Sequence, residues 1–123
     1  MTRRLTPAER LASADKDMLL NEIAQRSTWD RFLVEQAVFT FGLAHESFDC
    51  NMIRDVLPEL GHGFLGAAIN ALSRGGIIQH TGRTVPSTQA STHGHRIGVW
   101  TLTQKGRHIA AQRRAAQARK AAA

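Results

Sequence analysis

The sequence predicts a mainly helical domain that carries a small β-hairpin near its C-terminal end. The stretch from Phe48 to Leu102 indicates this fold class, because two short segments with helical apolar spacing are followed by two segments of strand character. A longer apolar helical segment precedes this stretch, and an alanine- and arginine-rich segment follows it. A chain of 123 residues can form one such domain with extensions at both ends.

An extended residue and a helix cap open this central stretch. We expect Phe48 to be extended and Asp49 to cap the following helix, because an Asp side chain accepts free N–H groups of a first turn. The helix is predicted over residues 51–57, with one apolar face made of Met52, Ile53, Val56 and Leu57. Pro58 ends it, since proline lacks an N–H and its ring clashes with the preceding turn.

The second short helix is predicted over residues 63–74, with Leu65, Ala68, Ile69 and Leu72 as its inward stripe. Gly75-Gly76 ends it. Strands are expected over 77–80 and 97–102, with a polar loop from Thr81 to Arg96 between them. Helix, turn, helix and hairpin in this order is the plan of a winged helix-turn-helix domain.

Two separate helices are expected before this stretch. Thr6 and Pro7 predict the start of an accessory helix within residues 1–27, which either packs on the domain or forms a dimer contact. Ser27-Thr28 predicts a second cap, followed by the most apolar helix of the chain, from Trp29 to about His45. Its aromatic residues are expected in the core of a domain that spans residues 28–103.

The positive charge is concentrated at the C-terminal end. The formal net charge is +6, yet residues 28–80 sum to −3, whereas residues 81–123 carry eight basic and no acidic side chains. Such a basic third on a near-neutral body indicates a polyanionic partner, above all double-stranded DNA.

The helix over residues 63–74 is the candidate reader of bases. Its inward stripe leaves Gly63, Ala67, Asn70 and Arg74 on the opposite face, with His62 at the start and Ser73 at the flank. A major groove admits a helix, in which Asn70 could bind adenine and Arg74 could bind guanine or a phosphate. The same face is also typical of a solvated surface or of a flat protein contact.

The hairpin loop and the tail supply the basic groups. Arg83 and Arg96 are expected in a minor groove, and the loop offers further polar groups to phosphates through Thr84, Ser87, Thr88, Gln89, His93 and His95. A plain polar loop is the alternative. Residues 104–123 predict a basic helix or tail without a core-facing stripe, in which Lys105, Arg107, Arg113 and Arg114 contact phosphates.

The stretch from Trp100 to Arg107, with Trp-x-Leu-Thr-x-x-Gly-Arg, resembles the end of the wing in bacterial winged-helix regulators of the MarR and PadR groups. The overall pattern also resembles small winged-helix proteins of actinobacterial phages. The resemblance implies a DNA-binding regulator, and it implies that Thr103 caps the last helix. The chain departs from these groups in residues 108–123, which offer only Ile109 and alanines for the dimer contact that their last helix makes.

Other classes of function find little support in the residues. Six scattered histidines, including His93-Gly94-His95, form no ligand cluster, so we expect no metal and no cofactor. No catalytic constellation or small-molecule substrate site is recognisable, and Cys50 is expected to be a small core or cap residue. With one cysteine and no long apolar run, the chain is expected in the cytoplasm, on the nucleoid and away from membranes.

Two hypotheses of different class therefore remain. The first is a DNA-binding winged-helix protein that serves transcription or replication. The alternative is a winged-helix module that binds another protein, for example a phage factor on a host protein, or a second copy of itself. The −3 charge of residues 28–80 favours this alternative, because it opposes close contact with phosphates.

Overall fold

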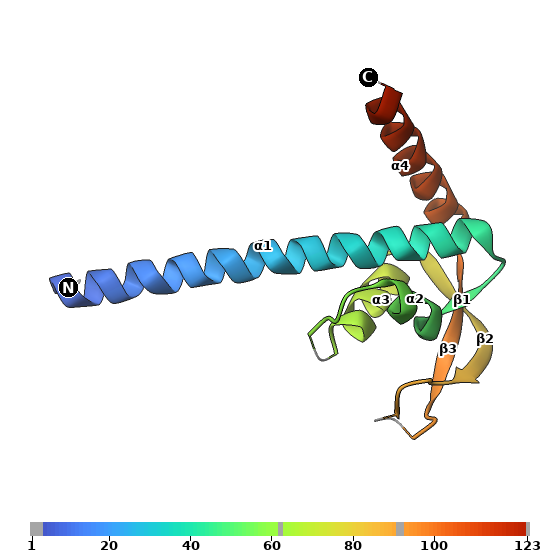
Figure 1. Ribbon diagram of the computed structural model, residues 1–123, viewed down its shortest axis with the longest axis horizontal. Coiled ribbons are helices and arrows are strands. Elements are labelled where there is room, and N and C mark those ends of the chain that lie inside the picture. Colours follow the sequence, from blue (N-terminus) through green and yellow to red (C-terminus); the bar gives the residue numbers. More distant parts are fainter. Residues whose placement is uncertain (1–3, 62, 91–92, 123) are drawn as a thin grey trace. The chain divides into compact units, whose positions relative to one another are not determined.

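The computed structural model describes residues 4–61, 63–90 and 93–122. It consists mainly of helices and has one small antiparallel sheet (Figure 1). In chain order they are α1 (Pro7–Ala44), β1 (Phe48–Asp49), α2 (Cys50–Val56), α3 (Phe64–Arg74), β2 (Ile78–Pro86), β3 (Arg96–Leu102) and α4 (Gln104–Ala122). Contacts divide the chain into two units, residues 1–32 and residues 33–123, and α1 contributes to both.

Helix α1 begins where the sequence predicts and then continues past the expected break. The backbone N–H of Glu9 donates to Thr6 Oγ1 over 3.2 Å, which is the predicted cap. The expected separation into two helices at Ser27-Thr28 is wrong, because Thr28 Oγ1 donates to the carbonyl of Ala24 over 2.9 Å. A hydroxyl bonded back to the preceding turn fits inside a helix and leaves no cap.

The first unit, residues 4–32 as described, exposes most of its apolar side chains. Trp29 is 59% exposed and Phe32 is 40% exposed, so their predicted place in the core is wrong. The two rings stack on each other with centroids 5.6 Å apart. Large aliphatic side chains earlier in α1 are exposed as well, among them Leu11, Met18 and Leu19.

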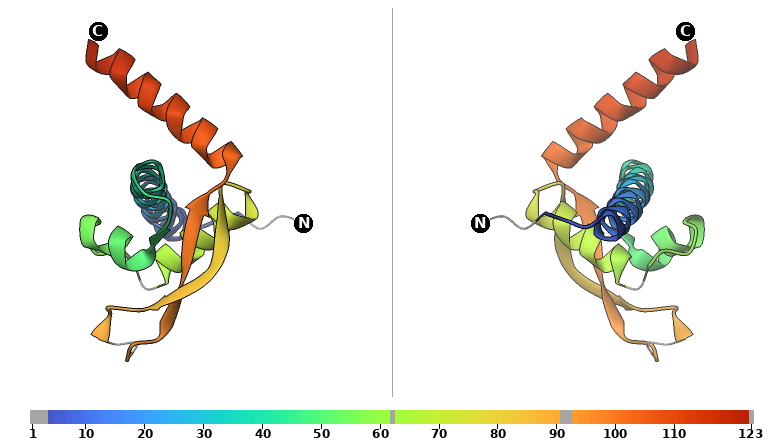
Figure 2. Two further views of the ribbon diagram at one scale, coloured as in Figure 1. Left: turned by 90° about the vertical axis from the view of Figure 1, so that its right-hand side faces the viewer. Right: turned by 90° about the vertical axis from the view of Figure 1, so that its left-hand side faces the viewer.

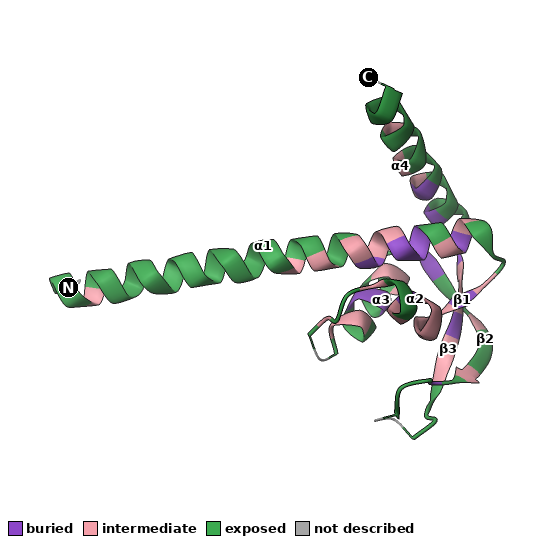
Figure 3. Cartoon of the chain, in the orientation of Figure 1, coloured by how far each residue is buried: buried purple, intermediate pink, exposed green. Residues whose placement is uncertain are grey.

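The second unit has a core between the last part of α1, the short helices and the sheet (Figure 3). Strand β3 lies between β1 and β2, and both neighbours run antiparallel to it. Phe48 pairs with Trp100, and Ile78 pairs with Leu102. The largest fully buried side chains are Phe48, Ile53, Ile78, Val34 and Val38.

Helices α2 and α3 form much as the sequence predicts. Asp49 caps α2, because its Oδ1 accepts the N–H of Met52 over 3.2 Å. Ile53 is buried, but Val56 is 60% exposed, so its predicted inward position is wrong. In α3 the predicted stripe faces the core, and the helix ends at Gly75, followed by Gly76 with a φ of 74° that favours glycine.

Strand β2 is longer than predicted, so the loop is shorter. Residues 81–86, expected in a loop, belong to β2, and the connection to β3 covers residues 87–95. An irregularity between His80 and Thr84 lets the strand continue, and Thr81 Oγ1 bridges it by donating to the carbonyl of Val99 over 2.8 Å. A bulge of this kind bends a strand and strengthens its twist.

Helix α4 is a packed helix at its start, not a tail without a core face. Thr103 Oγ1 accepts the N–H of Gly106 over 3.0 Å, which is the predicted cap. Gly106 and Ala110 are buried, and Ile109 packs against the core. The expectation of no core-facing stripe is therefore wrong, because small side chains let the helix approach closely. Of the helices in the described residues, none is both long and apolar enough to cross a membrane.

Candidate nucleic-acid interface

The outward face of α3 is the first part of the candidate interface. Gly63, Ala67, Asn70 and Arg74 are exposed as predicted, whereas Ser73 is half-buried. In the described part of the chain, the side chains of Asn70 and Arg74 have no hydrogen bond or ion pair. His62 lies outside the described residues. Helix α3 carries no acidic residue, so nothing on α3 itself repels a polyanion.

Helix α3 runs from the hairpin connection towards the start of α4. Near its first turn, Gly63 and Leu65 line an open hollow of about 610 Å³ together with Gln89 and Ile97. Just past its last turn, the carbonyl of Gly75 accepts a hydrogen bond from Lys105 Nζ over 3.0 Å. Helix α3 therefore has the hairpin connection near its first turn and the start of α4 near its last turn.

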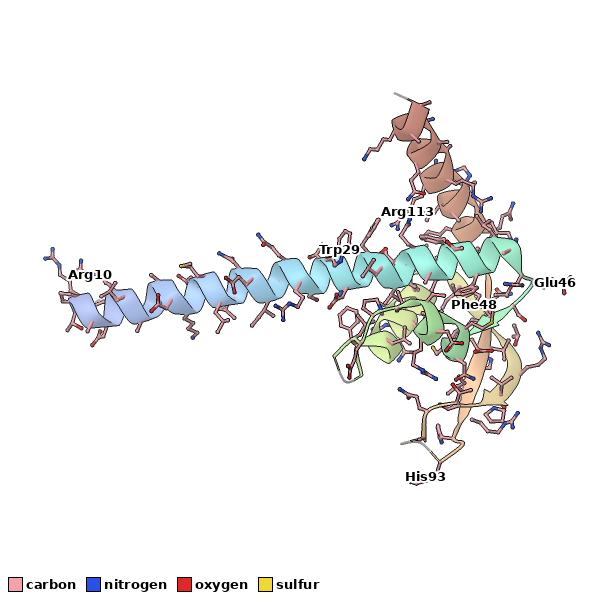
Figure 4. All side chains as sticks on the ribbon, viewed as in Figure 1. Arg10, Trp29, Glu46, Phe48, His93 and Arg113 are labelled. Carbon is pink, nitrogen blue, oxygen red and sulfur yellow. The ribbon has the colours of Figure 1, made fainter. Side chains whose placement is uncertain are left out.

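The β2–β3 connection and α4 lie at opposite ends of the sheet (Figure 2). Strand β3 joins them, and its seven residues span about 20 Å at the usual rise per residue. His93, at the tip of the connection, and Arg113 on α4 mark the two ends in Figure 4. A single ligand that contacts both ends must extend along the unit.

The two hairpin arginines are exposed but already bonded. Arg83 Nη2 donates to Ser47 Oγ over 3.1 Å, next to strand β1. Arg96 is held across the hairpin, because its Nε donates to Thr84 Oγ1 over 2.7 Å and its Nη2 to the Thr84 carbonyl over 2.6 Å. These bonds hold both guanidinium groups, and their remaining N–H groups are still available to an acceptor.

Two residues of α2, which sequence reasoning did not select for this role, anchor the base of the connection. Asn51 Nδ2 donates to the carbonyl of Pro86 over 3.0 Å, and Asn51 Oδ1 accepts from Thr88 N–H and Oγ1 over 3.0 and 3.1 Å. Arg54 Nη2 donates to Asn51 Oδ1 over 2.6 Å, and its longer contact to Ser87 Oγ is 3.4 Å. Arg54 therefore points to the base of the β2–β3 connection.

Residues of the β2–β3 connection differ in whether their side chains are accessible to a ligand. Ser87 is only 7% exposed, and its Oγ also accepts the N–H of Gln89 over 3.2 Å, so it stabilises the loop. Thr88, Gln89, His93 and His95 are exposed. His93 has a φ of 50°, and Gly94 follows with 76°, which makes a tight turn at the tip. The described residues contain no cluster of three or more histidines, cysteines or acids that could hold a metal ion.

The basic residues of α4 fall into bonded and unbonded ones. The Arg113 guanidinium lies 4.9 Å from the centre of the Phe39 ring, and its Nη2 is 3.2 Å from Glu35 Oε1. Its Nη1 also donates to Gln36 over 3.3 Å. Arg113 thus fastens α4 to α1, whereas Arg107 and Arg114 are exposed and, in the described chain, have no side-chain partner.

The hollow beside α3 offers no obvious reactive group. Cys50 lines it, but burial raises the pKa of this thiol, and the lowering effect of nearby Arg54 is smaller. The thiol is therefore protonated at neutral pH and a poor nucleophile.

Comparisons of the chain with models of protein families, with curated proteins and with solved structures found no match.

Proposed function

We propose that residues 33–122 form a winged helix-turn-helix domain that binds double-stranded DNA, as a transcriptional regulator or a replication accessory factor. The outward face of α3 supports this most, because Asn70 and Arg74 are exposed without side-chain partners on a helix that carries no acid. A helix with small neighbours at Gly63 and Ala67 can enter a major groove closely.

The charge distribution supports the same proposal. Residues 81–123 carry eight basic and no acidic side chains, and the exposed ones on α4 include Arg107 and Arg114. In this proposal α3 lies in the major groove, the β2–β3 connection contacts one backbone, and α4 contacts phosphates further along the duplex. Arg113 takes no part, because Glu35 and Phe39 already hold it.

A salt titration tests the proposal directly. Binding of a fluorescent random duplex is measured by anisotropy at a series of salt concentrations, and log K should fall by about 0.9 per phosphate contact for each unit of log[salt]. Arg107→Ala and Arg114→Ala should each reduce the slope, whereas the exposed Arg31→Ala, in the first unit, should leave it unchanged. Absence of duplex binding at low salt would refute the proposal.

Base reading is tested on a preferred site selected from random duplexes. Asn70→Ala should cost about 1–3 kcal/mol of binding free energy on that site and little on a random duplex, because a bidentate contact to adenine is lost. Equal losses on both duplexes would make α3 a contact to the backbone only. Deleting residues 108–123 is unsuitable here, since it removes the core contacts of Ile109 and Ala110.

A protein partner is the second candidate function, and the bonded arginines favour it. Three of the arginines expected to contact DNA, Arg83, Arg96 and Arg113, are already hydrogen-bonded within the chain, and so is Lys105. Residues 28–80 are also net acidic, at −3. A stoichiometric protein that co-purifies after nuclease treatment, and that Ala67→Lys releases, would support this candidate over DNA binding.

A further inference from the structure

Asn51, in the first turn of α2, uses its side-chain amide to hold the start of the β2–β3 connection. Its Nδ2 donates to the carbonyl of Pro86 over 3.0 Å. Its Oδ1 accepts the N–H of Thr88 over 3.0 Å and the Oγ1 hydroxyl of Thr88 over 3.1 Å. Pro86 and Thr88 lie 35 and 37 positions further along the chain, so this amide joins two segments that no local interaction brings together.

Arg54 determines which way the Asn51 amide points. Arg54 Nη2 donates to Asn51 Oδ1 over 2.6 Å. A guanidinium and a backbone N–H can only donate, so the amide oxygen must face Arg54 and Thr88, and the amide nitrogen must face the carbonyl of Pro86. Both ends of the amide therefore match their partners, because the reversed orientation would place donor against donor.

The β2–β3 connection has few other contacts that hold it in place. It covers residues 87–95, of which only Ala90 is apolar, and none of those that the structure describes belongs to the hydrophobic core. A segment without buried apolar side chains is held mainly by its hydrogen bonds. The N–H of Ser87 donates to the carbonyl of His95 over 2.7 Å, which closes the connection on itself. The bonds from α2 therefore decide where the connection lies.

Helix α2 is in turn held next to α3. Ile53 of α2 is fully buried and belongs to the same core cluster as Ala68 and Ile69 of α3. Close packing leaves such side chains few alternative positions, so α2 keeps its place relative to α3. Through Asn51 the connection also keeps its place relative to α3. The two parts of the candidate interface are thus arranged before any ligand binds.

We propose that Asn51 is a positioning residue for DNA binding, which holds the β2–β3 connection against one backbone of the duplex while α3 lies in the major groove. This role rests on the DNA binding proposed for residues 33–122, and it gives Asn51 itself no contact with DNA. A connection that is already in place loses less conformational freedom on binding, so binding is tighter. Without Asn51 the same contacts form at a larger cost in entropy.

Hydrogen exchange of the Thr88 amide, measured by NMR, tests this anchor in the absence of DNA. Asn51→Ala should speed the exchange at least about 10-fold, because the acceptor is removed and the connection opens more often. Alanine favours a helix more than asparagine does, so α2 should remain formed. Asn51→Asp keeps an acceptor for Thr88 and Arg54 and should retain most of the protection. Unchanged protection in Asn51→Ala would overturn the proposal, because other contacts would then hold the connection.

The affinity for a duplex, measured by fluorescence anisotropy, tests the consequence for binding. Asn51→Ala should weaken binding about 10-fold, since residues of the connection must then be ordered on the DNA. Val56→Ala, at an exposed position of the same helix, is the control and should leave the affinity unchanged. If the unaltered chain binds the duplex and Asn51→Ala binds it equally well, the positioning role is wrong and DNA binding stands. If the unaltered chain does not bind, DNA binding is wrong and the positioning role falls with it.

A shortened connection separates positioning from direct contact. Because the N–H of Ser87 bonds to the carbonyl of His95, residues 88–94 can be replaced by Asn-Gly, which forms a two-residue hairpin turn. This variant should bind the duplex more weakly than the unaltered chain, and adding Asn51→Ala should have no further effect, because no connection remains to be positioned. A further loss would mean that Asn51 itself contacts DNA, and full affinity after the shortening would mean that the connection takes no part. Either result overturns the proposal.

Discussion

Phe32 and Phe39 lie two turns apart on the same helix, yet Phe39 is buried and Phe32 is exposed. Phe39 is 5% exposed and packs in the core of the second unit, under the guanidinium of Arg113. Phe32 is 40% exposed and touches the ring of Trp29. The same residue type on the same helix is core in one unit and open surface in the other. The spacing of apolar residues defines one face of a helix, but that face is buried only where another element packs against it.

The largest expected difference between the units is in stability. Phe39→Ala should reduce the free energy of unfolding of the second unit by about 3–5 kcal/mol, because it removes a buried aromatic side chain and leaves a cavity. Phe32→Ala should cost about 1 kcal/mol or less, since much of its surface already faces solvent. Urea unfolding of both variants, compared with the unaltered chain and followed by far-ultraviolet circular dichroism, measures the difference. Equal losses would mean that Phe32 is buried in solution.

Proline substitutions in the two halves of α1 test whether the stability of the second unit depends on the first half of the helix. Ala37→Pro should destabilise the second unit by about 3 kcal/mol or more, because it breaks a helix that is packed at this buried position. Ala24→Pro should lower the helical circular dichroism signal but leave the denaturation midpoint of the second unit nearly unchanged. A large drop in that midpoint for Ala24→Pro would show that the two units fold as one.

Two glycines sharpen the contrast between close packing and open space. A Cβ at Gly106 would overlap the carbonyl of Ile77, so Gly106→Ala should cost about 1–3 kcal/mol by forcing α4 away from the sheet. Gly66, in α3, has open space around its Cα, so Gly66→Ala should stabilise the helix by about 0.5–1 kcal/mol. Thermal unfolding of the two variants should therefore shift in opposite directions.

Adjacent arginines on α4 give the smallest but most specific contrast. Arg113→Ala should cost about 1 kcal/mol of stability, because it removes a partly exposed ion pair and the contact with Phe39, and it should leave the salt dependence of DNA binding unchanged. Arg114→Ala should do the reverse, with stability retained and the salt slope reduced by about one unit. If Arg113→Ala reduces the salt slope as much as Arg114→Ala, the bonded and unbonded arginines are not distinct in function.

Local signals in the sequence were sufficient for the starts of α1, α2 and α4 and for the end of α3. Thr6, Asp49 and Thr103 accept the N–H groups they were expected to cap, and Gly75-Gly76 ends α3. Each of these interactions joins residues three or four positions apart, so the chain itself brings the partners together. The mainly helical class with a small hairpin follows from the same local signals.

The interactions that only the tertiary structure decided join residues far apart in the sequence. Asn51 holds Pro86 and Thr88, and Arg113 meets Glu35, across 35 to 78 positions. No spacing in the sequence indicates which of several arginines finds an acceptor, because that depends on how α4 and the sheet pack. The cap at Ser27-Thr28 failed for a related reason: a hydroxyl can end a helix or bond back to the preceding turn, and its local sequence is the same in both cases.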